Sequence, residues 1–301
     1  MLEAVIFDWG GTLTPWRTVD PHEAWRAYAG ALHADDVERA AEAARRLADA
    51  DLARWAGARD HSLAFTTAQV IRDALDDVAE GQDTAAIEAY REFWVHATHT
   101  DPEAGPMLSA LRRRGLRLGV LSSTPWPAAW HEEWLRRDGV LDLFDACVWS
   151  SDLPRTKPHP DAFRAALDAL GVTDPARAVY VGDRPYDDIS GAKAVGMRAV
   201  LVPHSDIPAH QQVPVDVTPD GVIQRLADLP ELIAGWCWAA RRRGPDRAHP
   251  PADPHGADPH GAQHRRTHRR THCRGAPPQG AHQRCARHPA VSSRGVSYPG
   301  A

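Results

Sequence analysis

A short apolar run near the start of the chain ends on an acidic residue. Residues 3–8 read EAVIFD, and the β-forming side chains in this run stand directly before Asp8. We interpret the run as a central strand of a parallel sheet, because both faces of such a strand are buried. Asp8 would then lie at the carboxyl end of the strand, where open α/β sheets bind ligands. The Gly-Gly-Thr turn at 10–12 supplies a flexible backbone next to that position.

The pattern changes to a helical one between about residues 15 and 100. Apolar residues recur there at spacings of three and four, and Asp or Thr stands near the start of several segments as a helix cap. We expect an all-helical insert of about four helices, with candidates at 23–32, 35–55, 66–79 and 83–97. We interpret Trp25, Trp55 and Trp94 as core anchors of this insert, because large aromatic side chains are usually buried.

Strands and helices alternate from residue 101 onward. The pattern predicts strands at 116–121, 146–149, 178–181 and 199–202, and helices at 107–114, 126–137, 161–170, 187–195 and 219–236. This order is typical of a parallel sheet covered on both faces and connected by right-handed crossovers. We therefore expect an α/β core made of residues 1–14 and 101–238, with the helical insert of residues 15–100 between its two parts.

The composition changes again beyond residue 238. Residues 239–301 hold 12 Arg and no Lys against 3 Asp and no Glu, a net charge of +9, whereas the rest of the chain carries −14. Pro, Gly, His and Arg dominate in short repeats, and aliphatic residues that could form a core are almost absent. Arg runs can bind nucleic acid, and His with Cys273 and Cys285 can bind a metal. We expect instead a disordered, basic tail, and no nucleic-acid partner.

No segment predicts export or membrane insertion. The first apolar run is too short for a signal peptide, and no run approaches the length that spans a bilayer. The four cysteines lack the paired spacing of a zinc ribbon or a disulfide framework. We expect a cytoplasmic protein without a membrane partner, and the sequence carries no signal for its oligomeric state.

Polar residues that could take part in catalysis or ligand binding stand at or near the ends of the predicted strands. Asp8 follows the first strand, Ser122 follows the second, and Asp183 follows the strand at 178–181. Lys157 lies in the segment RTKPHPDAF and is one of only two lysines in the chain. In order and spacing these motifs, together with VYVGDRPYDDISGA, resemble the haloacid dehalogenase (HAD) superfamily of hydrolases, of the subfamily I-like type with a helical cap. The resemblance covers roughly residues 1–236 and implies a Rossmann-like core with residues 15–100 as the cap.

The resemblance also implies roles for individual residues. Asp8 would be the nucleophile that forms an aspartyl-phosphate, because a carboxylate can attack a phosphoryl group when cations compensate the charge. Lys157 would restrain Asp8 and offset charge on the phosphoryl oxygens, and the Ser122 hydroxyl would donate to the same oxygens. The neighbouring residues expected to contact substrate are Gly11, Thr12 and Ser123.

A magnesium ion is the cofactor that the resemblance implies. Mg²⁺ prefers oxygen ligands, and the ligands implied here are Asp8, the backbone carbonyl of Gly10, Asp183 and Asp188. Asp188 matches the superfamily's spacing between the two acidic residues of this motif, counted from Asp183, better than Asp187 does. We interpret Asp187 as a cap of the following helix, because adjacent acids share one site only at a cost.

The first motif departs from the pattern of the superfamily's phosphatases at one position. Most of them carry a second Asp two residues after the nucleophile, which protonates the leaving alcohol, and this chain has Gly10 there. Loss of a general acid lowers rates by about 10² to 10⁴. The substrate could carry a good leaving group, as an acyl or aryl phosphate does, or the cap could supply the acid through His22 or Glu23.

Other reactions of the superfamily fit the sequence less well. The phosphonatase branch uses a cap lysine, and residues 15–100 contain none. The dehalogenase branch works without metal and has no need of the acidic pattern at Gly182-Asp183. We therefore expect a Mg²⁺-dependent phosphatase that acts on a small phosphorylated metabolite. The alternative is a weakened or inactive member that binds a phosphorylated ligand or a protein partner.

Overall fold

The computed structural model describes residues 2–17, 19–75, 83–203 and 213–242. The expectation for the tail lies outside the described residues from position 243 onward. Residues 239–242 belong to the last helix, α9 (Leu229–Arg242), so the folded part extends slightly beyond the predicted boundary at 238.

The described part of the chain forms a six-stranded parallel sheet in the order β3-β2-β1-β4-β5-β6. β1 lies inside the sheet between β2 and β4, so both its edges are hydrogen-bonded, as predicted for a central strand. The strands are β1 (Ala4–Phe7), β2 (Arg117–Ser122), β3 (Ala146–Trp149), β4 (Ala178–Gly182), β5 (Arg198–Leu201) and β6 (Gly221–Val222).

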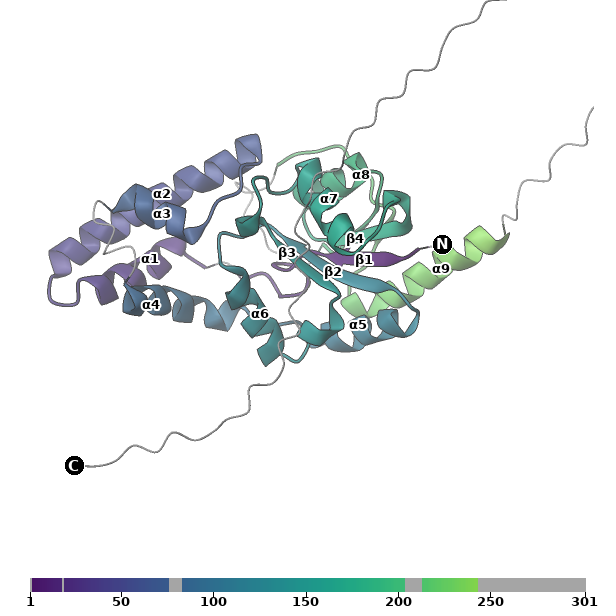
Figure 1. The fold of residues 1–301 in the computed structure, drawn as a ribbon, viewed down its shortest axis with the longest axis horizontal. Coiled ribbons are helices and arrows are strands. Elements are labelled where there is room, and N and C mark those ends of the chain that lie inside the picture. The colour runs from purple at the N-terminus through teal and green to yellow at the C-terminus, as the bar shows by residue number, and fades with distance from the viewer. Residues whose placement is uncertain (1, 18, 76–82, 204–212, 243–301) are drawn as a thin grey trace, which may run out of the picture.

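Helices cover both faces of this sheet (Figure 1). Val5 and Phe7 of β1 pack with apolar residues of α5, α6 and α9, whereas Ala4 and Ile6 pack on the opposite face with residues of α7 and α8. The uninterrupted apolar run of β1 is therefore explained by burial on both faces, and the α/β fold class is confirmed. These helices are α5 (Ala104–Arg113), α6 (Ala128–Arg137), α7 (Pro160–Ala169) and α8 (Gly191–Ala194).

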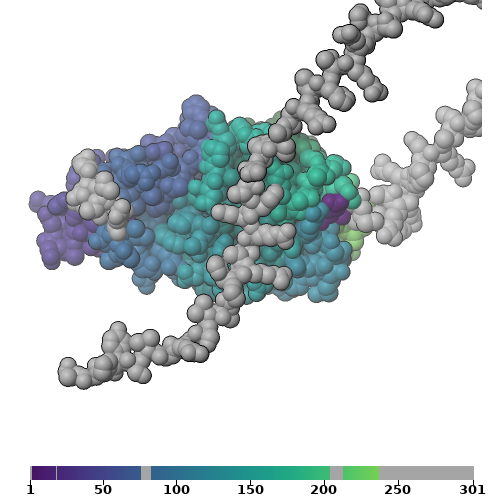
Figure 2. All heavy atoms as spheres, viewed as in Figure 1, coloured from purple at the N-terminus to yellow at the C-terminus, as the bar shows by residue number. Residues whose placement is uncertain are grey.

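The predicted helical insert is present as α1 (Pro21–Leu32), α2 (Val37–His61), α3 (Thr67–Ala74) and α4 (Thr84–Trp94). Side chains of Asp20, Asp36, Thr66 and Asp83 accept hydrogen bonds from the first turns, as the caps predicted. The helices enclose an apolar cluster of their own around Trp25, Tyr28 and Leu47. Figures 1 and 2 show them as a lobe beside the sheet, on the side toward which the chain leaves β1.

The helical lobe is bonded to the loops at the carboxyl edge of the sheet. The backbone N–H of Thr67 donates to the carbonyl of Pro125 (2.8 Å), and that of Thr156 donates to the carbonyl of Ser62 (3.0 Å). The indole N–H of Trp126 donates to the Tyr90 hydroxyl (3.3 Å). The lobe is thereby attached beside the loop that follows Ser122 and beside the segment that carries Lys157.

Two local predictions were wrong, and one predicted helix is present but begins with another helix type. Trp55 is 40% exposed and packs edge-on against Phe65, because it lies on a face of α2 that the lobe does not cover. The helix predicted from 219 begins only at Leu229, since residues 221–222 pair with β5 as an edge strand. The helix predicted at 187–195 begins as a π-helix at Pro185–Ser190, which widens the turn after β4.

None of the described helices is long and apolar enough to cross a membrane.

Candidate active site

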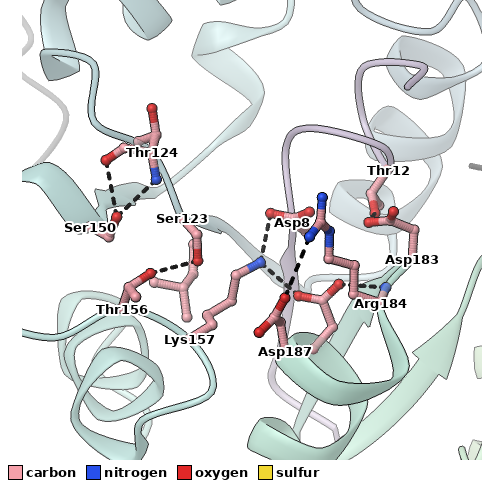
Figure 3. A network of polar contacts seen from close by, with 12 residues as sticks. Asp8, Thr12, Ser123, Thr124, Ser150, Thr156, Lys157, Asp183, Arg184 and Asp187 are labelled. Carbon is pink, nitrogen blue, oxygen red and sulfur yellow. Dashed lines mark hydrogen bonds and ion pairs between the residues drawn. The ribbon is translucent and has the colours of Figure 1, made fainter. Parts of the chain in front are cut away.

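Asp8 stands at the carboxyl end of β1 and is almost completely buried, with 5% of its surface exposed. Its backbone N–H donates to the carbonyl of Val181 at 2.9 Å, which continues the pairing of β1 with β4. One carboxylate oxygen, Oδ1, accepts a hydrogen bond from the Lys157 ammonium at 2.7 Å. Sheet pairing on one side and a buried cation on the other thus fix the orientation of this carboxylate (Figure 3).

Lys157 is also buried, and its ammonium contacts three oxygens. It donates to Oδ1 of Asp8 (2.7 Å), Oδ1 of Asp188 (2.6 Å) and the hydroxyl of Tyr180 (3.0 Å). Burial disfavours the charged ammonium, but the two carboxylates outweigh it and raise the pKa of Lys157 above its usual value. Lys157 therefore stays charged. Its hydrogen bonds connect the segment RTKPHPDAF to Asp8 at the end of β1 and to Asp188 after β4.

Tyr180 is a residue of this network that the sequence interpretation missed. It lies in β4, and its hydroxyl accepts from Lys157 and donates to the carbonyl of Leu121 at 2.9 Å. Burial raises the pKa of Tyr180 well above its usual value, so the hydroxyl keeps its proton. A tyrosine inside the apolar run VYVG was the available signal, because a buried tyrosine hydroxyl needs a partner.

Three buried carboxylates form a cluster that could hold a metal ion. Ligand oxygens of Asp8, Asp183 and Asp188 all lie within 4.8 Å of one another. Thr12 donates to Oδ1 of Asp183 at 3.3 Å, and the backbone N–H of Arg184 donates to Oδ2 of Asp188 at 2.9 Å. The structure thus brings together the three acidic residues that the sequence singled out as ligands.

Two glycines make room for these carboxylates. A Cβ on Gly182 would lie 2.4 Å from Cγ of Asp188, and a Cβ on Gly11 would lie 2.5 Å from Oδ2 of Asp183. Gly11 also has a φ of +88°, which other residues rarely adopt. Both positions therefore require glycine if the cluster is to keep its shape.

The cluster fits a divalent cation in charge and in chemistry. Three carboxylates against the Lys157 ammonium leave two negative charges in the cluster, and the neighbouring Asp187–Arg184 ion pair adds no net charge. Uncompensated buried charge is costly. Carboxylate oxygens are the ligands that hard divalent cations such as Mg²⁺ prefer. The described residues place no other cluster of three metal-ligating side chains.

Asp187 does not cap a helix, contrary to the sequence interpretation. The residue before this helical turn is Arg184, and Asp187 lies within the turn. Its carboxylate is 3.7 Å from the guanidinium of Arg184. Burial and then the charge of Asp188 raise the pKa of Asp187 to about 6.

The second motif lies across the site from this turn. Ser122 is buried at the end of β2, and none of the described residues forms a hydrogen bond with its hydroxyl. The Ser123 hydroxyl accepts from Thr156 at 2.6 Å, which links this loop to the segment carrying Lys157. The Ser150 hydroxyl forms two hydrogen bonds with the backbone of Thr124. It accepts from the Thr124 N–H (2.8 Å) and donates to the Thr124 carbonyl (3.1 Å) (Figure 3).

Gly10 lies two residues after Asp8, with open space around its Cα. A Cβ built on Gly10 would meet no described heavy atom within 4 Å. The two cap residues considered as substitute acids, His22 and Glu23, are both exposed at the start of α1. Glu23 forms an ion pair with Arg26 (3.4 Å), and no contact with the carboxylate cluster is found among the described residues. The geometry therefore gives neither residue a part in the site.

A buried carboxylate at the end of a central strand, a buried lysine and an acidic cluster that could hold a metal, together at the edge of a parallel sheet, are typical of one class of hydrolases. The haloacid dehalogenase-like hydrolase family matches residues 2–196. The chain belongs to this family.

The relatives of the chain include phosphatases and dehalogenases. The chain is 29% identical over 240 residues to a phosphatase of Mycobacterium tuberculosis, covering 78% of this chain and 98% of that protein. It is 33% identical over 184 residues to a phosphoserine phosphatase of Thermus thermophilus, covering 60% and 67%. A 2-haloacid dehalogenase from Pseudomonas syringae superposes with a TM-score of 0.54 at 29% identity, covering 78% of this chain and all of that one.

Proposed function

We propose that this chain is a divalent-metal-dependent phosphatase that acts on a small phosphorylated metabolite, with Mg²⁺ as its metal. The observation that carries this proposal is the cluster of Asp8, Asp183 and Asp188, whose ligand oxygens lie within 4.8 Å of one another. A phosphoryl group is itself anionic, so a carboxylate can attack it only where positive charge is concentrated. The names of two relatives, a phosphatase and a phosphoserine phosphatase, agree with the proposal.

The residues of the chain have separate tasks in the proposed reaction. Asp8 attacks phosphorus as the bond from phosphorus to the leaving oxygen breaks, and water then hydrolyses the aspartyl-phosphate to release phosphate and restore the carboxylate. Lys157 holds this carboxylate in place through Oδ1. Ser122, whose hydroxyl bonds to none of the residues that the structure describes, donates to the phosphoryl oxygens. The three carboxylates and the Gly10 carbonyl would hold the divalent cation, which would supply positive charge for the phosphoryl oxygens in the transition state. Gly11, Thr12 and Ser123 line the same edge and complete the proposed site.

The absence of a side chain at Gly10 narrows the proposed substrate class. Nothing at this position can protonate a leaving oxygen, so a leaving group that departs as a stable anion is favoured. Acyl and aryl phosphates meet this condition. We further propose that residues 15–100 form the cap and residues 1–14 with 101–238 the core, so that the cap residues select the substrate.

Dehalogenation is the alternative that one structural relative raises. The acidic cluster favours the phosphatase, because displacement of a halide by a carboxylate requires no metal and gains nothing from two further buried carboxylates. A non-catalytic binder would have no use for a nucleophile fixed by Lys157.

The test is hydrolysis of p-nitrophenyl phosphate by the full chain with Mg²⁺, with excess chelator, and by the Asp8→Asn variant. We expect turnover that requires the metal and is abolished by Asp8→Asn, while Asp161→Asn, an exposed acid on α7, retains it. Chloride release from 2-chloropropionate measures the dehalogenase alternative in parallel. Phosphatase activity equal to that of Asp8→Asn, or metal-independent chloride release, would refute the proposal.

A further inference from the structure

The hydrogen-bonding capacity of Lys157 is fully used within the protein. A lysine ammonium has three N–H donors. In this chain they go to Asp8 (2.7 Å), Asp188 (2.6 Å) and Tyr180 (3.0 Å), and all three partners are buried. Lys157 can therefore supply charge to a bound oxyanion, but it has no donor to offer unless one of these bonds is given up.

Arg184 is a second cation at the same site. Unlike the ammonium of Lys157, its guanidinium donates no hydrogen bond to the described residues. Its backbone N–H is bonded to Asp188, which fixes its position next to the carboxylate cluster. Its guanidinium lies 3.7 Å from Asp187, too far for a hydrogen bond, and forms none with any residue that the structure describes. Figure 3 shows the side chain reaching from its loop toward Asp8, with Lys157 on the other side of Asp8.

The ring of Trp16 supports this guanidinium. The centre of the Arg184 guanidinium is 5.1 Å from the centroid of the Trp16 ring, which is within the range of a cation–π contact. Stacking on a ring restricts the side chain and leaves the N–H groups at the guanidinium edge available, where oxyanions bind in a bidentate way. The side chain of Arg184 is 26% exposed, so a ligand can reach it.

We propose that Arg184 binds the phosphoryl group of the substrate directly, on the side of Asp8 opposite Lys157, and that Trp16 positions it. This inference rests on the proposed phosphatase function. Arg184 supplies the hydrogen bonds that Lys157 has no donors left to make, and Lys157 holds the nucleophile. The charges are thus divided between two residues, one for Asp8 and one for the phosphoryl oxygens.

The test uses inorganic phosphate as the probe, titrated calorimetrically into the full chain with Mg²⁺ present. Hydrogen bonds to charged groups contribute enough that Arg184→Met should weaken phosphate binding about ten- to a hundredfold. Arg184→Lys keeps the charge but loses the planar fork, so its phosphate affinity should lie between that of the wild type and that of Arg184→Met. Arg164→Met removes an exposed arginine of α7 and should bind as the wild type does.

A second titration, with Mg²⁺ alone, separates phosphate binding from an effect on the metal. Its affinity should change by less than about twofold in Arg184→Met, because the backbone and not the side chain of Arg184 holds Asp188. Equal losses of metal and phosphate affinity would overturn the inference, as would phosphate affinity within twofold of the wild type. If the wild type hydrolyses and Arg184→Met binds phosphate unchanged, only the inference fails. If the wild type neither hydrolyses an aryl phosphate nor binds phosphate, the proposed function fails and the inference falls with it.

Discussion

Replacing Gly10 by aspartate should give the proposed site a carboxyl proton donor two residues after Asp8. The position accepts a side chain, since a Cβ there meets no described heavy atom within 4 Å and Gly10 does not have a positive φ. The new carboxyl would lie near Asp8, whose negative charge raises the pKa of a neighbouring acid and favours the protonated form that a donor needs. A well-placed general acid contributes about 10² to 10⁴ in rate. Since a side chain introduced without supporting contacts realises part of this, we expect at least about a tenfold gain.

The gain should depend on the leaving group. Turnover of an alkyl phosphate should rise, whereas turnover of p-nitrophenyl phosphate should change little because its leaving group departs without a proton. The assay is therefore the ratio of kcat/KM for the two substrates, measured in Gly10→Asp and in the matched variant Gly10→Asn, which has the same shape and no acidic proton. An unchanged ratio in a variant that keeps the wild-type melting temperature and Mg²⁺ affinity would refute the reasoning, and so would an equal gain in Gly10→Asn.

Two further predictions concern buried carboxylates. Burial raises the pKa of Asp51 to about 6, although the Trp25 indole N–H donates to it at 3.3 Å. The folded state therefore holds this proton more tightly than the unfolded chain, and stability is lost as the pH rises from about 4 to 6, by up to about 3 kcal/mol. In urea denaturation, Asp51→Asn should be more stable than the wild type at pH 8 and equal to it at pH 4; equal stability at both would contradict the burial argument. Gly182→Ala should lower Mg²⁺ affinity at least about tenfold, because its methyl group would displace Asp188; calorimetry that finds wild-type affinity would show that the cluster tolerates the shift.

Local apolar patterns were sufficient to predict the main elements of the sheet. The run before Asp8 and the alternation after residue 101 predicted five of the described strands, because buried strands need continuous apolar side chains. The two-residue β6 was missed, since Gly221 and Val222 form a strand only through pairing with β5. The start of α9 was misplaced for the same reason. These features depend on contacts between distant segments, and no local pattern carries them.

In the candidate site, too, some residues could be predicted from the sequence and others depend on contacts between distant segments. The resemblance of the motifs to the HAD superfamily was enough to select Asp8, Lys157 and Asp188, which the structure brings into one hydrogen-bonded group. The interpretation of Asp187 as a helix cap was wrong, because a π-helical turn cannot be distinguished from an α-helical one by apolar spacing. The tyrosine in the run VYVG signalled that a buried hydroxyl needs a partner, but only the fold shows that this partner is a lysine 23 residues away.

The bond between Thr156 and Ser62 joins the helical lobe to the residue directly before Lys157. The backbone donor beside the buried ammonium is therefore satisfied by the helical lobe and not by the sheet. The lobe's residues thus take part in fixing the backbone from which Lys157 reaches Asp8.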